Sequence, residues 1–230
     1  MTIKNNIVRY TQNLPPGCTL IAVSKTQPPE KIQEAYDAGQ RAFGENKAQE
    51  MARKHEQLPR DIQWHMIGHL QTNKVKYIAP FVHLIHSVDS LKLLTEIDKQ
   101  AKKNNRVIAC LLQVHIAEEE SKFGFSAEEI HELLKSEELK SLNHIRITGL
   151  MGMATFTENM EQVRKEFHSL NHLFTTLKNK PLPKQVVMQE LSMGMSGDYQ
   201  IAIEEGSTMI RIGTAIFGER NYASASSTQQ

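Results

Sequence analysis

Several features that would assign a protein class at once are missing from this 230-residue sequence. Its two cysteines, Cys18 and Cys110, lie far apart without a CxxC pair, which favours free thiols in a reducing cytoplasm over disulfides. The longest apolar run, residues 107–112, is too short to span a bilayer, and residues 1–10 lack the apolar segment of a secretory signal. The formal net charge of +1 gives no case for a nucleic-acid or membrane partner. We therefore expect a cytoplasmic protein with neither partner.

Short apolar, β-branched runs bounded by turn residues recur along the chain and indicate buried strands. Segments with helical periodicity lie between them. The predicted strands are residues 20–24, 41–44, 63–67, 82–86, 106–114, 146–150, 185–188 and 208–212. Strands that alternate with helices form parallel sheets, and eight such units suit a chain of 230 residues. We therefore predict an α/β fold, a closed (β/α)8 TIM barrel.

Local signals mark several of the connecting helices. Asp89 is expected to cap the helix after the fourth strand, and Ser126 with Glu129 forms a capping box for the helix after the fifth. These helices are the crossovers that a parallel sheet requires. The long helix before the seventh strand has one apolar face, made of Val163, Phe167, Leu170, Phe174 and Leu177.

A doubly wound open sheet is the competing architecture. It requires a glycine-rich turn after the first strand, whereas residues 25–27 are Lys-Thr-Gln. No linker or composition shift marks a second domain, so residues 1–222 are expected to form one barrel domain. Residues 223–230 are small and polar and are expected to be a disordered tail.

Lys25 comes directly after the first predicted strand, at its C-terminal end. In a TIM barrel, functional residues collect at this end of the strands. One interpretation is a lysine whose ammonium group reaches back to solvent. The other is a desolvated lysine with a lowered pKa, whose neutral amine can form a Schiff base. The strand alone does not decide between them.

The segments after the seventh and eighth predicted strands contain glycine together with serine or threonine. Residues 192–197 are Ser-Met-Gly-Met-Ser-Gly, and Gly213 and Thr214 follow the eighth strand. These two loops form the usual phosphate site of a TIM barrel, because glycine lets backbone N–H groups approach an anion. Taken alone, residues 192–197 would be a flexible turn. Together with Gly213 and Thr214 they predict a phosphate cradle.

A reactive lysine and a phosphate cradle at one end of the barrel suggest a single ligand that spans both. Pyridoxal 5′-phosphate (PLP) has an aldehyde for the lysine and a phosphate for the cradle. Its pyridine nitrogen requires a partner, and Arg211 at the end of the eighth strand is the candidate. The alternative for Arg211 is a salt bridge with Glu190 or Glu219.

His65 and His69 have the i, i+4 spacing of a metal-binding pair. Gly68 lies between them at a strand-to-helix turn, which disrupts the helical spacing, and no carboxylate or cysteine ligand is obviously linked to them. We therefore expect a structural or polar-contact role for both histidines and no metal.

Seven ordered motifs resemble those of the pyridoxal phosphate homeostasis proteins, which are single-domain relatives of the alanine racemase barrel. The resemblance runs from about residue 20 to residue 218. The motifs are Ala22-Val-Ser-Lys-Thr26, Phe43-Gly-Glu-Asn46, Trp64-His-Met-Ile-Gly-His-Leu-Gln-Thr-Asn-Lys74, His86-Ser-Val-Asp89, Gly149-Leu-Met-Gly-Met153, Leu191-Ser-Met-Gly-Met-Ser196 and Arg211-Ile-Gly-Thr-Ala-Ile-Phe-Gly218.

The resemblance implies a role for each member of a cofactor site. Lys25 would carry the PLP Schiff base, and Arg211 would face the pyridine nitrogen. Ser192 would hold the phosphate together with the glycine and threonine after the eighth strand. The implied cofactor-binding residues are Lys25, Asn46, Ser192, Met193, Met195, Arg211, Gly213 and Thr214. One departure is His115, where we expect asparagine, and it puts in doubt any polar contact that the family makes from the fifth strand.

The function that the resemblance implies is intracellular PLP homeostasis, with the cofactor carried and not used in catalysis. The implied partners are PLP and PLP-dependent apo-enzymes. The alternative is a PLP-dependent amino-acid racemase. A third possibility, a barrel that binds a phosphate ester without a Schiff base, holds only if Lys25 is unreactive.

Racemisation requires a base on each face of the α-carbon. Alanine racemases supply the second base as a tyrosine from outside the barrel, and they carry a separate β-domain. Only residues 221–230 lie beyond Arg220, which leaves no room for such a domain. Arg211 would also keep the pyridine nitrogen unprotonated, which weakens the ring as an electron sink. We therefore expect no efficient racemase activity.

Overall fold

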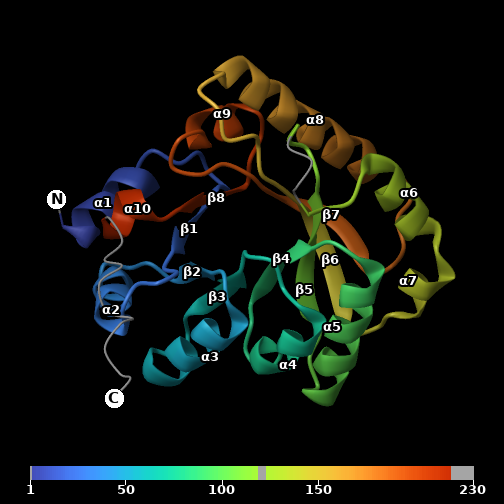
Figure 1. Cartoon of the computed structure of the whole chain (residues 1–230), viewed down its shortest axis with the longest axis horizontal. Coiled ribbons are helices and arrows are strands. Elements are labelled where there is room, and N and C mark those ends of the chain that lie inside the picture. Colours follow the sequence, from blue (N-terminus) through green and yellow to red (C-terminus); the bar gives the residue numbers. More distant parts are fainter. Residues whose placement is uncertain (1, 119–122, 219–230) are drawn as a thin grey trace, which may run out of the picture.

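The buried apolar segments form eight parallel strands that close into a barrel, with helices packed around it (Figure 1). The computed structural model describes residues 2–118 and 123–218. The last strand pairs with the first in parallel, which closes the barrel and confirms the predicted fold class. The strands are β1 (Thr19–Val23), β2 (Ala42–Glu45), β3 (Gln63–Met66), β4 (Leu84–Val88), β5 (Ile108–Val114), β6 (Ile145–Gly152), β7 (Val186–Ser192) and β8 (Met209–Ile212).

Each strand is followed by at least one helix, as crossovers between parallel strands require. In Figure 1 the helices lie outside the strands. No helix in the described part of the chain is long and apolar enough to cross a membrane. The helices are α1 (Ile3–Thr11), α2 (Pro29–Asp37), α3 (Ala48–Gln57), the 3-10 helix η1 (Thr72–Lys74), α4 (Val75–Ile78), α5 (Leu91–Lys103), α6 (Ala127–Lys135), α7 (Glu137–Ser141), α8 (Met160–Lys178), α9 (Tyr199–Glu204) and α10 (Thr214–Phe217).

Two of the predicted helix caps can be compared with the structure. The capping box of α6 is present, with Ser126 and Glu129 bonded reciprocally, as predicted. The predicted cap at Asp89 is wrong, because the side chain of Ser90 accepts the N–H of Leu93 instead. Asp89 turns toward His69. Both residues suit an N-cap locally, and the tertiary partner decides between them.

Strand ends shift by up to four residues from the predicted positions. The largest shift is in β7, which was expected to end at Met188 and continues to Ser192. Polar Gln189 and Glu190 interrupt its apolar run, but the backbone still pairs with β6 through the registers Leu150↔Leu191 and Met151↔Ser192. Ser192 is therefore a strand residue, and the following loop begins later than predicted.

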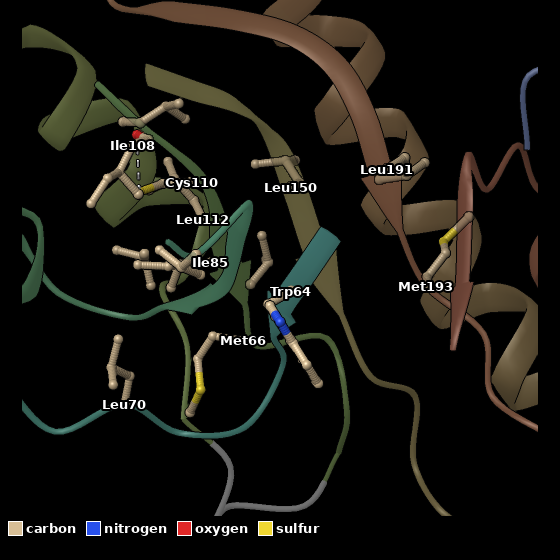
Figure 2. Packing of buried hydrophobic residues seen from close by; sticks show 14 of the residues in the cluster. Trp64, Met66, Leu70, Ile85, Ile108, Cys110, Leu112, Leu150, Leu191 and Met193 are labelled. Atoms are coloured by element: carbon tan, nitrogen blue, oxygen red, sulfur yellow. Dashed lines mark hydrogen bonds between the residues drawn. The ribbon is translucent and has the colours of Figure 1, made fainter. Parts of the chain in front are cut away.

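Apolar side chains form two layers, one between strands and helices and one inside the barrel. The five predicted apolar residues of α8 all face the outer layer. Figure 2 shows part of this layer, with Trp64, Ile85 and Leu191 buried in one cluster. The inner layer is smaller and is made of Ile21, Ala42, Leu84, Leu111, Met151 and Met209. It fills the barrel below the C-terminal strand ends.

Candidate functional site

A cavity of about 350 Å³ opens at the C-terminal ends of the strands, which is where a TIM barrel places its site. Residues from the ends of β1, β2, β3, β5, β6, β7 and β8 contribute to its wall. A larger hollow lies on the outer surface among α1, α2 and α3, away from the strand ends. We place the site in the smaller cavity because six of the eight predicted residues meet there. These are Lys25, Asn46, Met195, Arg211, Gly213 and Thr214.

Lys25 enters the cavity from the turn after β1 and is half-buried. Its neighbours differ, because Ser24 is fully buried and Thr26 is exposed. Thr26 has a φ of 64°, in the left-handed region that a β-branched residue rarely adopts. The chain therefore reverses direction sharply just after the lysine.

Asn46 lines the cavity directly after β2. The loop after β3 packs against it so closely that a Cβ atom on Gly68 would lie 2.6 Å from the Asn46 backbone oxygen. Real Cβ atoms do not approach backbone at this distance, so only glycine fits here. The contact holds Asn46 and the Gly68 loop together at the rim.

The loop after β7 runs beside β8 at the cavity wall. The Met193 N–H donates to the Met209 oxygen, and the Arg211 N–H donates to the Gly194 oxygen. Asp198 accepts the N–H of Met195 at 2.5 Å, which fixes the β7 loop. Gly213 precedes α10 and lies close to β1, since a Cβ atom on Gly213 would lie 3.3 Å from the Cβ atom of Val23. Ser196, Gly213 and Thr214 thus gather on one side of the cavity, as a phosphate cradle requires.

Arg211 carries a buried positive charge into the cavity wall. Its side chain is held from two sides, because Nη1 donates to Ser192 Oγ at 2.6 Å and Nη2 donates to the Gly152 oxygen at 3.0 Å. Burial lowers its pKa to about 10, and Asp198 opposes that shift. None of the ion pairs among the described residues includes Arg211. An electron-rich ligand atom would complete its coordination.

The alternative salt bridge for Arg211 is absent as far as the described residues show. The Glu190 carboxylate accepts the Thr208 hydroxyl at 2.6 Å and forms no described ion pair with Arg211. Glu219, the other candidate, lies outside the described residues, as do the predicted domain boundary at residue 222 and the tail 223–230.

Two neutral histidines support the Ser192–Arg211 contact from inside the barrel. His65 Nδ1 and His86 Nε2 lie 2.8 Å apart, and His86 Nδ1 lies 2.9 Å from Ser192 Oγ. Burial lowers the pKa of His65 to about 3, and burial with the nearby His65 and Arg211 lowers the pKa of His86 well below its usual value. Both rings are therefore neutral, and they form a hydrogen-bonded chain that ends at Arg211.

Ser192 and Met193 do not line the cavity, in contrast to the other predicted residues. Ser192 is fully buried, and its hydroxyl is engaged by Arg211 and His86. Met193 is fully buried in the outer apolar layer, as Figure 2 shows. Neighbouring residues of an extended chain face opposite sides of the barrel wall, so Met193 points into the outer layer while the Ser192 hydroxyl faces Arg211. In this structure Ser192 contributes to the site through Arg211.

His65 and His69 diverge, because their rings have different hydrogen-bond partners. No group of His, Cys, Asp and Glu among the described residues is arranged to hold a metal ion. His65 lies inside the barrel, whereas His69 lines the cavity and pairs with Asp89 at 3.1 Å. The ring of His69 also stacks on Phe123, with centroids 4.2 Å apart.

Several cavity residues were missed by sequence reasoning. They include Gln113, which donates to the Phe123 oxygen at 2.9 Å and so holds the loop after β5 against the cavity. His115, the expected departure from the family, is not part of the lining. Polar residues at strand ends were the available signal, and Gln113 satisfied it. The missed residues are Val23, Ile67, Gly68, His69, Gln113, Phe123 and Met153, whereas Ser196 belongs to the predicted phosphate segment 192–197.

The arrangement suits a phosphorylated aldehyde with an aromatic nitrogen. A half-buried lysine can reach the aldehyde, the glycine and hydroxyl loops can accept the phosphate, and Arg211 can donate to the nitrogen. The apolar side chains of Val23, Ile67 and Met153 offer surface for the ring.

Comparisons with known proteins give the relatives of this chain. The family model for the alanine racemase N-terminal domain matches residues 1–221. A pyridoxal phosphate homeostasis protein from Aquifex aeolicus is 46% identical over 204 residues, which cover 88% of this chain and 87% of that protein. A second one, from Haemophilus influenzae, is 38% identical and covers 98% of this chain and 99% of the relative.

Solved structures agree with this similarity. PipY of Synechococcus elongatus, determined with PLP bound, is 36% identical, covers 94% of this chain and all of its own, and superposes with a TM-score of 0.85. An alanine racemase from Bartonella henselae has a TM-score of 0.71 at 17% identity, and this chain covers 60% of it. The likeness to that racemase shows the shared barrel alone.

Proposed function

This chain belongs to the pyridoxal phosphate homeostasis protein family, and we propose that it binds PLP as a carrier in intracellular PLP homeostasis without catalysing a reaction of its own. The observation that carries the proposal is one cavity that combines Lys25, Arg211 and the Gly213–Thr214 segment. The relative PipY was solved with PLP bound at 36% identity to this chain, which supports PLP as the ligand.

Each group of the cofactor has a counterpart in the cavity. PLP supplies an aldehyde, which forms a Schiff base with a lysine amine. We assign that lysine to Lys25, the pyridine nitrogen to Arg211, and the phosphate to the loops that carry Ser196, Gly213 and Thr214. Asn46 and Met195 line the same space. Ser192 does not line this space and acts by orienting Arg211, whereas Met193 packs in the outer apolar layer.

The assignment of Lys25 is tested by trapping the bound cofactor. The PLP-loaded protein is reduced with borohydride, digested and mapped by mass spectrometry, and we expect the pyridoxyl group on Lys25. The variant Lys25→Ala should lose the visible absorbance band of the Schiff base while keeping weak phosphate-driven binding. An adduct found only on another lysine, such as Lys47 or Lys74, would contradict the assignment.

The phosphate site is tested by comparing PLP with unphosphorylated pyridoxal. Hydrogen bonds to a charged phosphate are each worth roughly 1.5–3 kcal/mol, so the loss of two should weaken binding by two to four orders of magnitude. Titration of both vitamers measures the ratio. Equal affinities would show that these loops do not bind phosphate.

The cellular setting follows from the same proposal. Cys18 and Cys110 are free thiols, which suits the reducing cytoplasm. A carrier must also pass its cofactor on, and PLP-dependent apo-enzymes are the proposed acceptors. Incubation of the loaded protein with such an apo-enzyme, followed by an activity assay of that enzyme, tests the transfer. Transfer no faster than release of PLP into buffer would exclude a direct exchange.

Amino-acid racemisation is the second candidate, and one observation favours testing it. His69 lines the cavity and is oriented by Asp89, so a second titratable group besides Lys25 faces the ligand space. The similarity at 36–46% identity is nevertheless to homeostasis proteins, and the racemases share the fold alone. Chiral chromatography of single L-amino acids after incubation should show no turnover near 1 per second, a rate typical of enzymes. Such turnover, lost in both Lys25→Ala and His69→Gln, would favour the racemase.

A further inference from the structure

A second lysine, Lys54, lies buried beneath the turn that carries Lys25. Its side chain belongs to α3, and the residue is only 5% exposed. All three hydrogens of its ammonium group have acceptors, because Nζ lies 2.8 Å from the Ser24 oxygen, 2.7 Å from Glu45 Oε1 and 2.8 Å from Glu50 Oε1. Lys54 is thus fully engaged within the protein.

The same two carboxylates also hold the chain around Lys25 directly. Glu45 Oε1 accepts the Ser24 hydroxyl at 2.6 Å, and Glu50 Oε1 accepts the Thr26 backbone N–H at 2.7 Å. The residues before and after Lys25 are therefore bonded to one cluster of Lys54, Glu45 and Glu50. We call this cluster the turn clamp.

We propose that the turn clamp positions Lys25, so that its amine is aimed into the cavity before the ligand arrives. This inference rests on the proposed role of Lys25 as the PLP lysine. Lys54, Glu45 and Glu50 are positioning residues, because they act on the backbone on either side of Lys25 and do not line the cavity.

The geometry of Thr26 shows why such a clamp is needed. Its φ of 64° is unfavourable for a β-branched residue, and a free chain would relax to a more extended turn. The bond from its N–H to Glu50 opposes that relaxation. The carboxylate is suited to the task, because Lys54 and the Thr26 N–H lower the pKa of Glu50 against the effect of burial. Glu50 therefore stays ionised at neutral pH.

Stability alone does not explain this cluster. Glu45 is fully buried, and burial raises the pKa of its carboxyl group against the effect of Lys54. A buried ion pair of this kind is often no more stabilising than apolar side chains of similar volume. Apolar side chains could not hold the Ser24 oxygen and the Thr26 N–H, however, and these two bonds determine the direction of the turn.

The test compares Glu50→Ala with Glu50→Gln. Alanine removes the acceptor of both the Thr26 N–H and Lys54, whereas glutamine keeps an oxygen at that position. We expect Glu50→Ala to raise the PLP dissociation constant and to slow Schiff-base formation by about tenfold or more, because small misplacement of a reacting group is costly. Glu50→Gln should restore both values to within about threefold. Stopped-flow absorbance and equilibrium titration measure them.

Glu96→Ala is the matched control. Glu96 accepts a hydrogen bond from Gln100 one turn along α5, at 2.6 Å, and does not contact the turn of Lys25. It should leave PLP binding unchanged. Urea unfolding of each apo-variant separates a general loss of stability from the loss of position. If Glu50→Ala destabilises the protein but binds PLP with unchanged affinity and rate, the cluster is structural and the inference is wrong.

Failure of the inference can be told apart from failure of the proposed function. Borohydride mapping of the wild-type protein reports the PLP lysine independently of Glu50. An adduct on Lys25 together with unchanged binding in Glu50→Ala rejects only the clamp. An adduct on another lysine rejects the premise and the clamp with it.

Discussion

Arg211 brings a positive charge into a buried position in the cavity wall. Its residue surface is 4% exposed, and its described partners are a hydroxyl and a carbonyl oxygen. Burial of a charge is expensive unless hydrogen bonds and an opposite charge offset it. The protein provides two hydrogen bonds, and an acceptor atom of the proposed ligand would add a third. Arg211 is therefore expected to favour ligand binding while its buried charge lowers the stability of the apo-protein.

Replacement of Arg211 by methionine should separate these two effects. The variant loses a charge-assisted hydrogen bond to the ligand, so the PLP dissociation constant should rise by roughly 10- to 100-fold. The free energy of unfolding of the apo-protein should change by less than about 1 kcal/mol, because relief of the buried charge offsets the two lost hydrogen bonds. Titration and urea unfolding measure the two quantities.

Arg106→Met is the control for this prediction. Arg106 also donates to two backbone oxygens, those of Ala79 and Val82, but it lies near the start of β5, at the other end of the barrel. It should lower stability without changing PLP affinity. Wild-type affinity in Arg211→Met would show that the guanidinium does not contact the ligand.

The pairing of β6 with β7 includes one position that only glycine fits. Gly149 pairs with Glu190, and a Cβ atom at position 149 would lie 1.8 Å from the Glu190 oxygen. The pairing register shifts between Ile147 and Gly149, so the two backbones approach closely at this irregularity. This approach sets the course of β7 toward Ser192 and the loop beyond it.

Gly149→Ala should therefore destabilise the protein by about 3 kcal/mol or more, because the added methyl group meets backbone that cannot move aside. Gly197→Ala is the matched control, since a Cβ atom there would meet nothing within 4 Å, and it should change stability by less than about 0.5 kcal/mol. Chemical unfolding of both variants measures the difference. Similar stabilities would mean that the strands separate easily at this point.

At the scale of the whole molecule, the buried histidines should make stability depend on pH. His65 and His86 are neutral in the folded chain, where their pKa values are lowered, but they take up protons in the unfolded chain below about pH 6.5. Acid therefore favours the unfolded state. The contribution of these neutral histidines to stability is fully present above about pH 6.5. It should be lost as the pH drops toward 3, by up to about 1.4 kcal/mol per pH unit for each histidine.

Urea unfolding between pH 4 and pH 7 checks this dependence, because this is roughly the range over which the unfolded histidines titrate. His65→Gln should flatten the slope, whereas His172→Gln, at an exposed position on α8, should leave it unchanged. A slope that is the same in all three proteins would assign the acid sensitivity to other groups.

Ligand binding should stabilise the whole barrel, because the proposed PLP cavity is lined by residues from both ends of the chain. Free PLP at 100 times its dissociation constant should raise the free energy of unfolding by about 2.7 kcal/mol. Lys25→Ala should show a smaller increase at the same PLP concentration, since its affinity is lower. Thermal unfolding with and without PLP measures both. No increase in the wild-type protein would contradict specific binding to the folded state.

Local patterns in the sequence determined the alternation of strands and helices, the closed barrel and the strand ends where the site lies. They also located Lys25, Arg211 and Gly213 with Thr214, because these residues lie at or just after the ends of recognisable strands. Such patterns depend on neighbours a few positions away, and those neighbours are visible in the sequence itself. The cap at Asp89 and the end of β7 were misplaced, since tertiary pairing overrode the local preference at both.

Only the tertiary structure decided what surrounds each of these side chains. It buried Ser192 behind Arg211, turned Met193 into the outer core, and joined His65 to His86 inside the barrel. It also showed that the deeply buried lysine beside the site is Lys54, held by Glu45 and Glu50, and that Lys25 is half-buried. The face that a strand residue presents depends on the register with its neighbours, and the partners in these contacts lie 21 to 106 residues away. That register is set only when the barrel closes, so local sequence patterns do not reveal it.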